Sequence, residues 1–268
     1  MSPTVLIQAI QRRRTSLIWW TLGLAALAAL IAVAYPTVRD DASLDKTFSQ
    51  LSPGIQAALG LDPHTLITSP VGYLNSQYIA NVLPVTLLVF SVGVAGWTVA
   101  GDEAQGTLEL LLANPIGRFR VALERAGAMV VMLAGLTAVS TIVLLLLAPG
   151  TKLTEGLAAS HIAAAGIASA LAALTYASLT FAIGAATGKR GLAIGVSTSI
   201  AVAGFVVQGL AEQVKVLRVV RDLMPWNWLI DGDPLRTGFG YLSFVVPLTV
   251  TTVLIVAGAW LFRTRDLA

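Results

Sequence analysis

Long apolar stretches alternate along this chain with shorter polar segments, and the apolar stretches have the length of membrane-spanning helices. A helix needs about 20 apolar residues to cross roughly 30 Å of hydrocarbon, because its backbone polar groups must be satisfied within the segment. Six stretches meet this requirement: Leu17 to Ala34, Asn81 to Ala100, Gly127 to Ala148, Ile162 to Thr187, Gly191 to Leu210 and Tyr241 to Phe262. The pattern predicts an all-α membrane protein built as a bundle of six transmembrane helices.

The first stretch has a second interpretation. Three arginines at positions 12–14 precede it, and the Ala-Val-Ala sequence at 32–34 resembles a signal-peptidase site, so a cleaved signal peptide is the alternative. The stretch is longer than the apolar core of a signal peptide, which is about 7 to 15 residues. Trp19 and Trp20 suit an interfacial anchor. We therefore expect this stretch to remain as the first span.

Composition supports the membrane class. Hydrophobic residues make up 56% of the 268 residues and charged residues 12%, against about 25% charged in soluble domains, and the mean hydropathy is +0.80. The length suits one polytopic bundle, a single domain over residues 1–268, without a further soluble enzyme domain of roughly 100 to 200 residues. The chain has no cysteine and a net charge of only +3, and no basic stretch alternates with aromatic residues, so we expect no thiol chemistry and no nucleic-acid partner.

The connecting segments differ in their content of lysine and arginine, which predicts the orientation of the chain. One side receives Arg12, Arg13, Arg14, Arg118, Arg120, Arg125, Lys189, Arg190, Arg263 and Arg265. The other side receives Arg39, Lys46, Lys152, Lys215, Arg218, Arg221 and Arg236, in longer segments that also carry several aspartates. The first side is predicted to be cytoplasmic, which makes this a multi-pass membrane protein with both termini inside.

The densest polar motif of the chain, DEAQGTLELLLANPIGR at 102–118, lies between the second and third predicted spans. Asp102 can cap a short helix while Gln105 reaches back to its start, and Pro115 ends it. The leucines at 108 and 110–112 give this helix an apolar face outside the membrane. That face could lie on lipid, but the acidic residues of the motif favour a basic groove on a partner protein.

The motif resembles the coupling segment of type-2 ABC exporter permeases, and the order of spans and loops agrees with that family over the whole chain. The resemblance implies that the segment docks on a separate ATP-binding subunit, which would bind ATP and Mg²⁺, while this chain needs no cofactor. It also implies a second permease chain, identical or homologous, in a bacterial inner membrane. The implied coupling residues are Asp102, Glu103, Gly106, Thr107, Leu108, Glu109, Leu110, Leu111, Leu112, Pro115 and Arg118.

Two segments are predicted to lie outside the membrane. The first, residues 35–81, contains turn signals, and its Asp62 and His64 are too few for a zinc site. The second follows the fifth span with an amphipathic pattern at 210–224, which predicts a helix at the outer interface. Trp226 and Trp228 then fit either an interfacial belt or, with Pro225, an external exit gate. The resembling family has a gate in this region.

These observations predict a permease subunit that exports an amphipathic or hydrophobic compound and has no catalytic site of its own. The glycine-rich stretch at 184–190 lacks the spacing of a phosphate-binding loop. The substrate path is expected along the second and fifth spans, with scattered polar points at Ser91, Thr98, Ser197, Thr198 and Ser199. An ion-driven secondary transporter and a non-transporting membrane anchor are the alternatives, although charged residues near the midplane, which ion coupling usually needs, are missing from the spans.

Overall fold

The computed structural model describes residues 5–51, 55–56, 65–98, 100–101, 117–211, 214 and 216–265. Within these residues the regular structure is helical and no strand occurs. This confirms the predicted all-α class and the six spans, each long and apolar enough to cross a membrane. The six helical runs are Arg14–Arg39, Pro70–Thr98, Arg118–Leu147, Ala159–Thr187, Arg190–Leu210 and Tyr241–Thr264.

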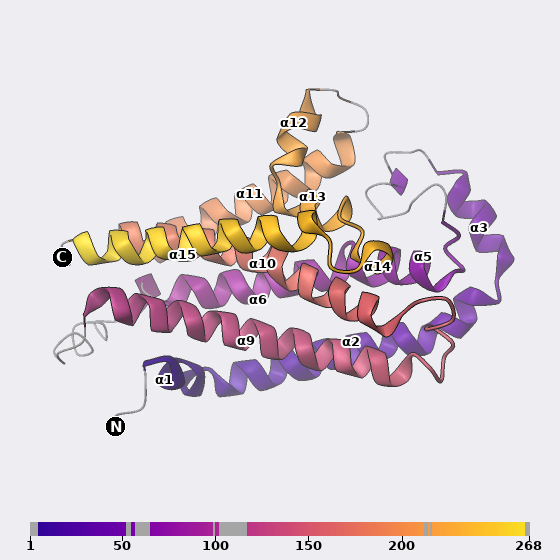
Figure 1. Cartoon of the computed structure of the whole chain (residues 1–268), viewed down its shortest axis with the longest axis horizontal. Coiled ribbons are helices and arrows are strands. Elements are labelled where there is room, and N and C mark those ends of the chain that lie inside the picture. The colour runs from indigo at the N-terminus through magenta and orange to yellow at the C-terminus, as the bar shows by residue number, and fades with distance from the viewer. Residues whose placement is uncertain are drawn as a thin grey trace.

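Each run is made of one or more helical elements (Figure 1). In chain order these are α2 (Arg14–Arg39), α5 (Pro70–Leu74) with η1 (Asn75–Ile79) and α6 (Val82–Thr98), α9 (Arg118–Leu147), α10 (Ala159–Thr187), α11 (Arg190–Leu210), and η2 (Tyr241–Val245) with α15 (Val246–Thr264). The elements η1 and η2 are single turns of π-helix. The shorter helices are α1 (Val5–Arg12), α3 (Ala42–Ser49), α12 (Leu217–Asp222), α13 (Pro225–Ile230) and α14 (Pro234–Thr237).

Helix α10 is the centre of the bundle and packs against α6, α9, α11 and α15. Buried residues make up 72% of its most apolar part, against 17% for α2. The sequence of α10 explains this position, because its many alanine, glycine and serine residues let neighbouring backbones come close. One close approach is to α15 at Gly258, where a Cβ atom would lie 2.8 Å from the Cα of Ala182. Only glycine fits there.

The helices extend beyond the predicted spans. Helix α9 begins at Arg118 instead of Gly127, and α2 continues past Pro36 to Arg39. The physical reason is that the end of an apolar stretch marks the edge of the hydrocarbon, whereas a helix continues until its backbone hydrogen bonds are interrupted. Several arginines that the sequence places in a loop therefore stand on helical turns.

Different helices and connections lie at the two ends of the bundle (Figure 1). Both termini lie at one end, together with α1 and the start of α9, and we call this the terminal end. Helix α3 and the connection from α9 to α10 lie at the opposite end. An even number of spans requires both termini on one side, as the sequence predicts.

The amphipathic helix predicted at 210–224 is shorter than expected. Helix α11 continues to Leu210, and the separate helix α12 has only six residues, Leu217–Asp222. Of the residues expected on its apolar face, Leu210, Val214 and Val220 are exposed, with 43%, 45% and 37% of their surface accessible. Leu217 and Met224 are half-buried, so the described part of this chain covers the expected face only in part.

Candidate functional site

Most of the predicted coupling segment lies outside the described residues. This applies to Asp102, Glu103, Gly106, Thr107, Leu108, Glu109, Leu110, Leu111, Leu112 and Pro115. The last residue of the motif, Arg118, is described and is the first residue of α9. Its Nη1 donates a hydrogen bond to the carbonyl of Arg265 at 2.8 Å, and Nη1 of Arg265 donates to the carbonyl of Ala185 at 2.9 Å. Arg118 therefore links the start of α9 to the ends of α15 and α10.

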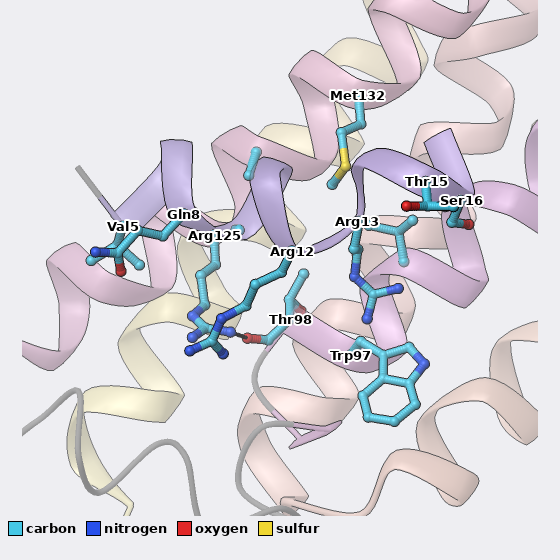
Figure 2. Close-up of a pocket in the computed structure, with 13 residues that line it drawn as sticks. Val5, Gln8, Arg12, Arg13, Thr15, Ser16, Trp97, Thr98, Arg125 and Met132 are labelled. Carbon is cyan, nitrogen blue, oxygen red and sulfur yellow. Dashed lines mark hydrogen bonds between the residues drawn. The ribbon is translucent and has the colours of Figure 1, made fainter. Parts of the chain in front are cut away.

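A pocket of about 520 Å³ lies at the terminal end, between α1, the start of α2, the end of α6 and α9 (Figure 2). Arg12, Arg13 and Arg125 line it, together with polar side chains that include Gln8. Its remaining wall is apolar and includes Met132 on α9. The pocket therefore combines a strongly basic part with an apolar part.

Arg125 is the buried charge of this pocket, with 6% of its surface exposed. Its Nη1 donates a hydrogen bond of 2.6 Å to the carbonyl of Thr98, in the last turn of α6. Carbonyls in the last turn of a helix have no partner within the helix, and the helix dipole also favours a positive charge there. Arg125 thus joins α9 to the end of α6.

A tryptophan on α6 holds two further arginines of this region. The guanidinium carbon of Arg13 lies 5.4 Å from the centre of the Trp97 ring, and that of Arg190 lies 3.6 Å from it. Such contacts are attractive because the face of an aromatic ring is electron-rich. Burial, and then the charge of Arg190, lowers the pKa of Arg13. Positive charge is therefore concentrated around Trp97.

Helix α1, which sequence reasoning missed, closes one side of the pocket. Val5 is buried and Leu6, Ala9 and Ile10 pack against the core, while Ile7 is exposed. Leu6 comes close to α9 at Gly127, where a Cβ atom would lie 3.3 Å from the leucine Cδ1. The signal for α1 was its helical spacing of apolar residues opposite Gln8 and Arg12, but a segment of eight residues is too short to be recognised as a span.

The predicted external gate residues lie on α13. Trp226 is 3% exposed and packs edge-on against Phe205 of α11, with ring centres 5.6 Å apart. Trp228 is 8% exposed, and its Nε1 donates a hydrogen bond of 2.9 Å to the carbonyl of Asp222. Pro225 begins the helix and is also buried. Because their own chain buries both tryptophans, the interpretation as a lipid-facing belt is wrong, while the gate stays a prediction.

The five expected polar points of the substrate path do not face one space. Ser91 is buried and donates a hydrogen bond to the carbonyl of Ala173 on α10, and Ser197 is buried as well. Thr198 and Ser199 are exposed on the outer face of α11. Thr98 is buried at the pocket described above. Within one chain, therefore, only part of this set is available to a substrate.

No group of three or more histidine, aspartate or glutamate side chains that could hold a metal ion occurs among the residues that the structure describes. Asp62 and His64 fall outside them. The other histidine, His161, has its Nδ1 3.0 Å from the carbonyl of Leu235, which connects the start of α10 with α14. This histidine has a structural contact in the described fold.

Comparison with known proteins adds one match. The family model described as "Multidrug efflux system permease Rv1217c, C-terminal domain" matches residues 2–263 of this chain. A comparison with curated proteins found no match. The family match spans all six helical runs and both ends of the bundle.

Proposed function

The chain belongs to this family of multidrug efflux permeases, which are ABC-2-type permeases, and from this premise we propose that it is the membrane-spanning subunit of an ATP-driven exporter. The observation that carries the proposal is the match over residues 2–263 together with the six apolar helices. A permease of this family is a transport subunit, so ATP and Mg²⁺ would bind to a separate ATP-binding subunit. The cargo would be amphipathic or hydrophobic.

We place the contact with the ATP-binding subunit at residues 102–118. Two observations support this placement. The segment connects α6 and α9, whose adjoining ends lie at the terminal end, and the excess of arginine there predicts the cytoplasmic side of a bacterial inner membrane. The hydrogen bonds from Arg118 to Arg265 and from Arg265 to Ala185 would carry a movement of this segment to α15 and to the central helix α10.

The complete transporter would contain two permease chains. The exposed face of α11 supports this, because Val202, Phe205 and Val206 are each 40% exposed or more. Thr198 and Ser199 lie on the same helix and are also exposed. A second chain, identical or homologous, would cover part of this face and complete a path for an apolar cargo between the two permeases. The gate residues of α13 would lie at the outer end of that path.

The proposal is tested first by isolating the tagged chain from its native membrane in a mild detergent. A polypeptide with a nucleotide-binding loop should copurify, and the double variant Glu103→Lys, Glu109→Lys should lose it. The control is Asp40→Lys, Glu155→Lys, which makes the same change of charge at exposed positions of the opposite end. Copurification that survives the first variant would remove residues 102–118 from the proposal.

Transport itself separates the proposal from its alternatives. Proteoliposomes that contain the chain and its copurified partner should move a fluorescent apolar dye only when ATP and Mg²⁺ are present on the partner's side. Dye movement driven by an ion gradient without ATP would identify a secondary transporter. A complex that hydrolyses ATP but moves no dye or lipid would identify a membrane anchor.

A further inference from the structure

The arginine pocket at the terminal end is not explained by transport of an apolar cargo. Arg12, Arg13 and Arg125 line a single pocket, so their positive charges lie near one another. Like charges at such distances repel one another, and more strongly where water is partly excluded. A basic pocket of this kind is most stable when it holds a negative charge.

The described part of the chain does not supply that negative charge to Arg12 or Arg13. The side chains that line the pocket include no carboxylate, and no ion pair of either arginine occurs among the described residues. Arg13 instead stacks on Trp97. A cation–π contact orients a guanidinium without neutralising it, so the edge of the group keeps its capacity to donate hydrogen bonds.

The geometry of the basic part suits a phosphate group. A guanidinium presents its N–H groups as a planar fork, which matches two oxygens of a phosphate, and such charge-assisted hydrogen bonds are strong. Figure 2 shows the side chains of Arg12 and Arg125 extending toward the same part of the pocket, with Arg13 above the ring of Trp97. Two or more arginines could thus contact one phosphate from different helices.

The apolar part of the pocket indicates that the phosphate belongs to a lipid. Val94, Ala128 and Met132 line the wall that leads into the bundle, whereas Gln8 and Arg12 stand at the exposed side on α1. A soluble phosphate compound would leave that apolar wall unused, while the glycerol and upper acyl chain of a lipid would cover it. Basic pockets between spanning helices at a membrane surface are known to bind anionic lipid headgroups.

We propose that this pocket binds the phosphate headgroup of an anionic phospholipid, with Arg12, Arg13 and Arg125 supplying its positive charge. The bound lipid would connect α1 and the start of α2 to the end of α6 and to α9. The inference goes beyond the proposed export function. Its test requires neither an ATP-binding subunit nor transport, so the two can fail separately.

The test measures lipid binding by native mass spectrometry of the delipidated chain in a neutral detergent. Phosphatidylglycerol should bind, and the double variant Arg12→Gln, Arg13→Gln should weaken its binding about tenfold. The control is Arg14→Gln, Arg263→Gln, which removes the same charge from exposed residues of the terminal end that do not line the pocket. Equal losses in the two double variants would overturn the proposal, since binding would then follow net charge.

Two further measurements use the unmodified chain, so a folding defect of the variant does not decide the matter. Phosphatidylglycerol should raise the thermal midpoint more than phosphatidylcholine does, because the choline group cancels the charge of the phosphate. Glycerol phosphate should displace the bound lipid poorly. Efficient displacement by glycerol phosphate would show that the site takes soluble phosphates. If the chain bound phosphatidylglycerol only after the substitutions Asp102→Asn and Glu103→Gln, those two carboxylates would be the natural partners of the arginines. Either result would overturn the lipid proposal.

Discussion

The terminal end and the region of α13 hold their helices together in different ways. At the terminal end, Arg125 binds a carbonyl of α6 and Arg13 stacks on Trp97, and a pocket remains between the helices. At α13, the aromatic side chain of Trp226 fills the space against Phe205 and is almost fully buried. A charged group can exchange one oxygen partner for another as helices shift, whereas a tightly packed aromatic side chain cannot move without leaving a cavity. The comparison teaches that the contacts of the terminal end can rearrange at a smaller cost in free energy than the packing of Trp226.

The largest expected effect comes from removing the aromatic packing of α13. Trp226→Ala should lower the free energy of unfolding by about 3 to 5 kcal/mol, because it leaves a cavity beside Phe205. The measurement is the thermal midpoint of the purified chain in detergent. Trp19→Ala is the control, since Trp19 is 68% exposed on α2 and should change the midpoint little. Equal effects of the two substitutions would mean that α13 is not tightly packed.

A smaller loss should follow when the contact between α10 and α15 is overfilled. Gly258→Ala places a methyl group 2.8 Å from the backbone of α10 and should destabilise the chain by about 1 to 3 kcal/mol. Gly23→Ala on α2 is the control, because outside the neighbouring backbone of its own helix no atom lies within 4 Å of the position that its new methyl group would occupy. The comparison predicts that α10 and α15 behave like the α13 region. An unchanged thermal midpoint for Gly258→Ala would mean that α10 and α15 can move apart at little cost in free energy, unlike the packed helix α13.

The contact made by Arg118 should matter less for stability. Arg118→Ala removes the hydrogen bond to the carbonyl of Arg265 and should cost about 1 kcal/mol, since the bond is only partly buried. Hydrogen exchange of the first turn of α9 should become faster. Arg120→Ala removes only the exposed ion pair with Glu124 and should have a smaller effect. A larger effect of Arg120→Ala than of Arg118→Ala would mean that the hydrogen bond between α9 and α15 does not contribute to stability.

The smallest expected effect is a pH dependence of the stability of α3, which lies at the end of the bundle opposite the terminal end. Asp41 caps α3, and hydrogen bonds from the hydroxyl and then the backbone N–H of Ser43 lower the pKa of its carboxyl group from its ordinary value. A lowered folded-state pKa stabilises the helix above the ordinary aspartate value, and this contribution is lost as the pH falls through the folded-state pKa. Amide protection in α3 should therefore decrease in strong acid. Asp41→Asn keeps a capping side chain and should remove this pH dependence; a dependence that persists would point to another group.

The sequence predicted the spans well but not the contacts between them. All six spans and the position of both termini at one end follow from apolar length and charge counts, and the structure confirms them. In the sequence, Arg125 is one of several positive charges in a connecting segment, whereas its burial depends on the rotation of α9 that turns it toward Thr98. The sequence pattern around the tryptophans of α13 is also typical of an interfacial belt. Tryptophans near a membrane surface give this pattern whether lipid or protein covers them.

What the sequence determined by itself is the membrane class, the number of spans and the position of both termini at one end of the bundle. These properties depend on length and composition along one dimension, measured against the fixed thickness of a bilayer. The tertiary structure alone decided that α10 is central, that α1 closes an arginine pocket and that Trp226 is buried. Those properties depend on how closely helices approach and which faces they turn to each other, and such contacts join residues far apart in the chain.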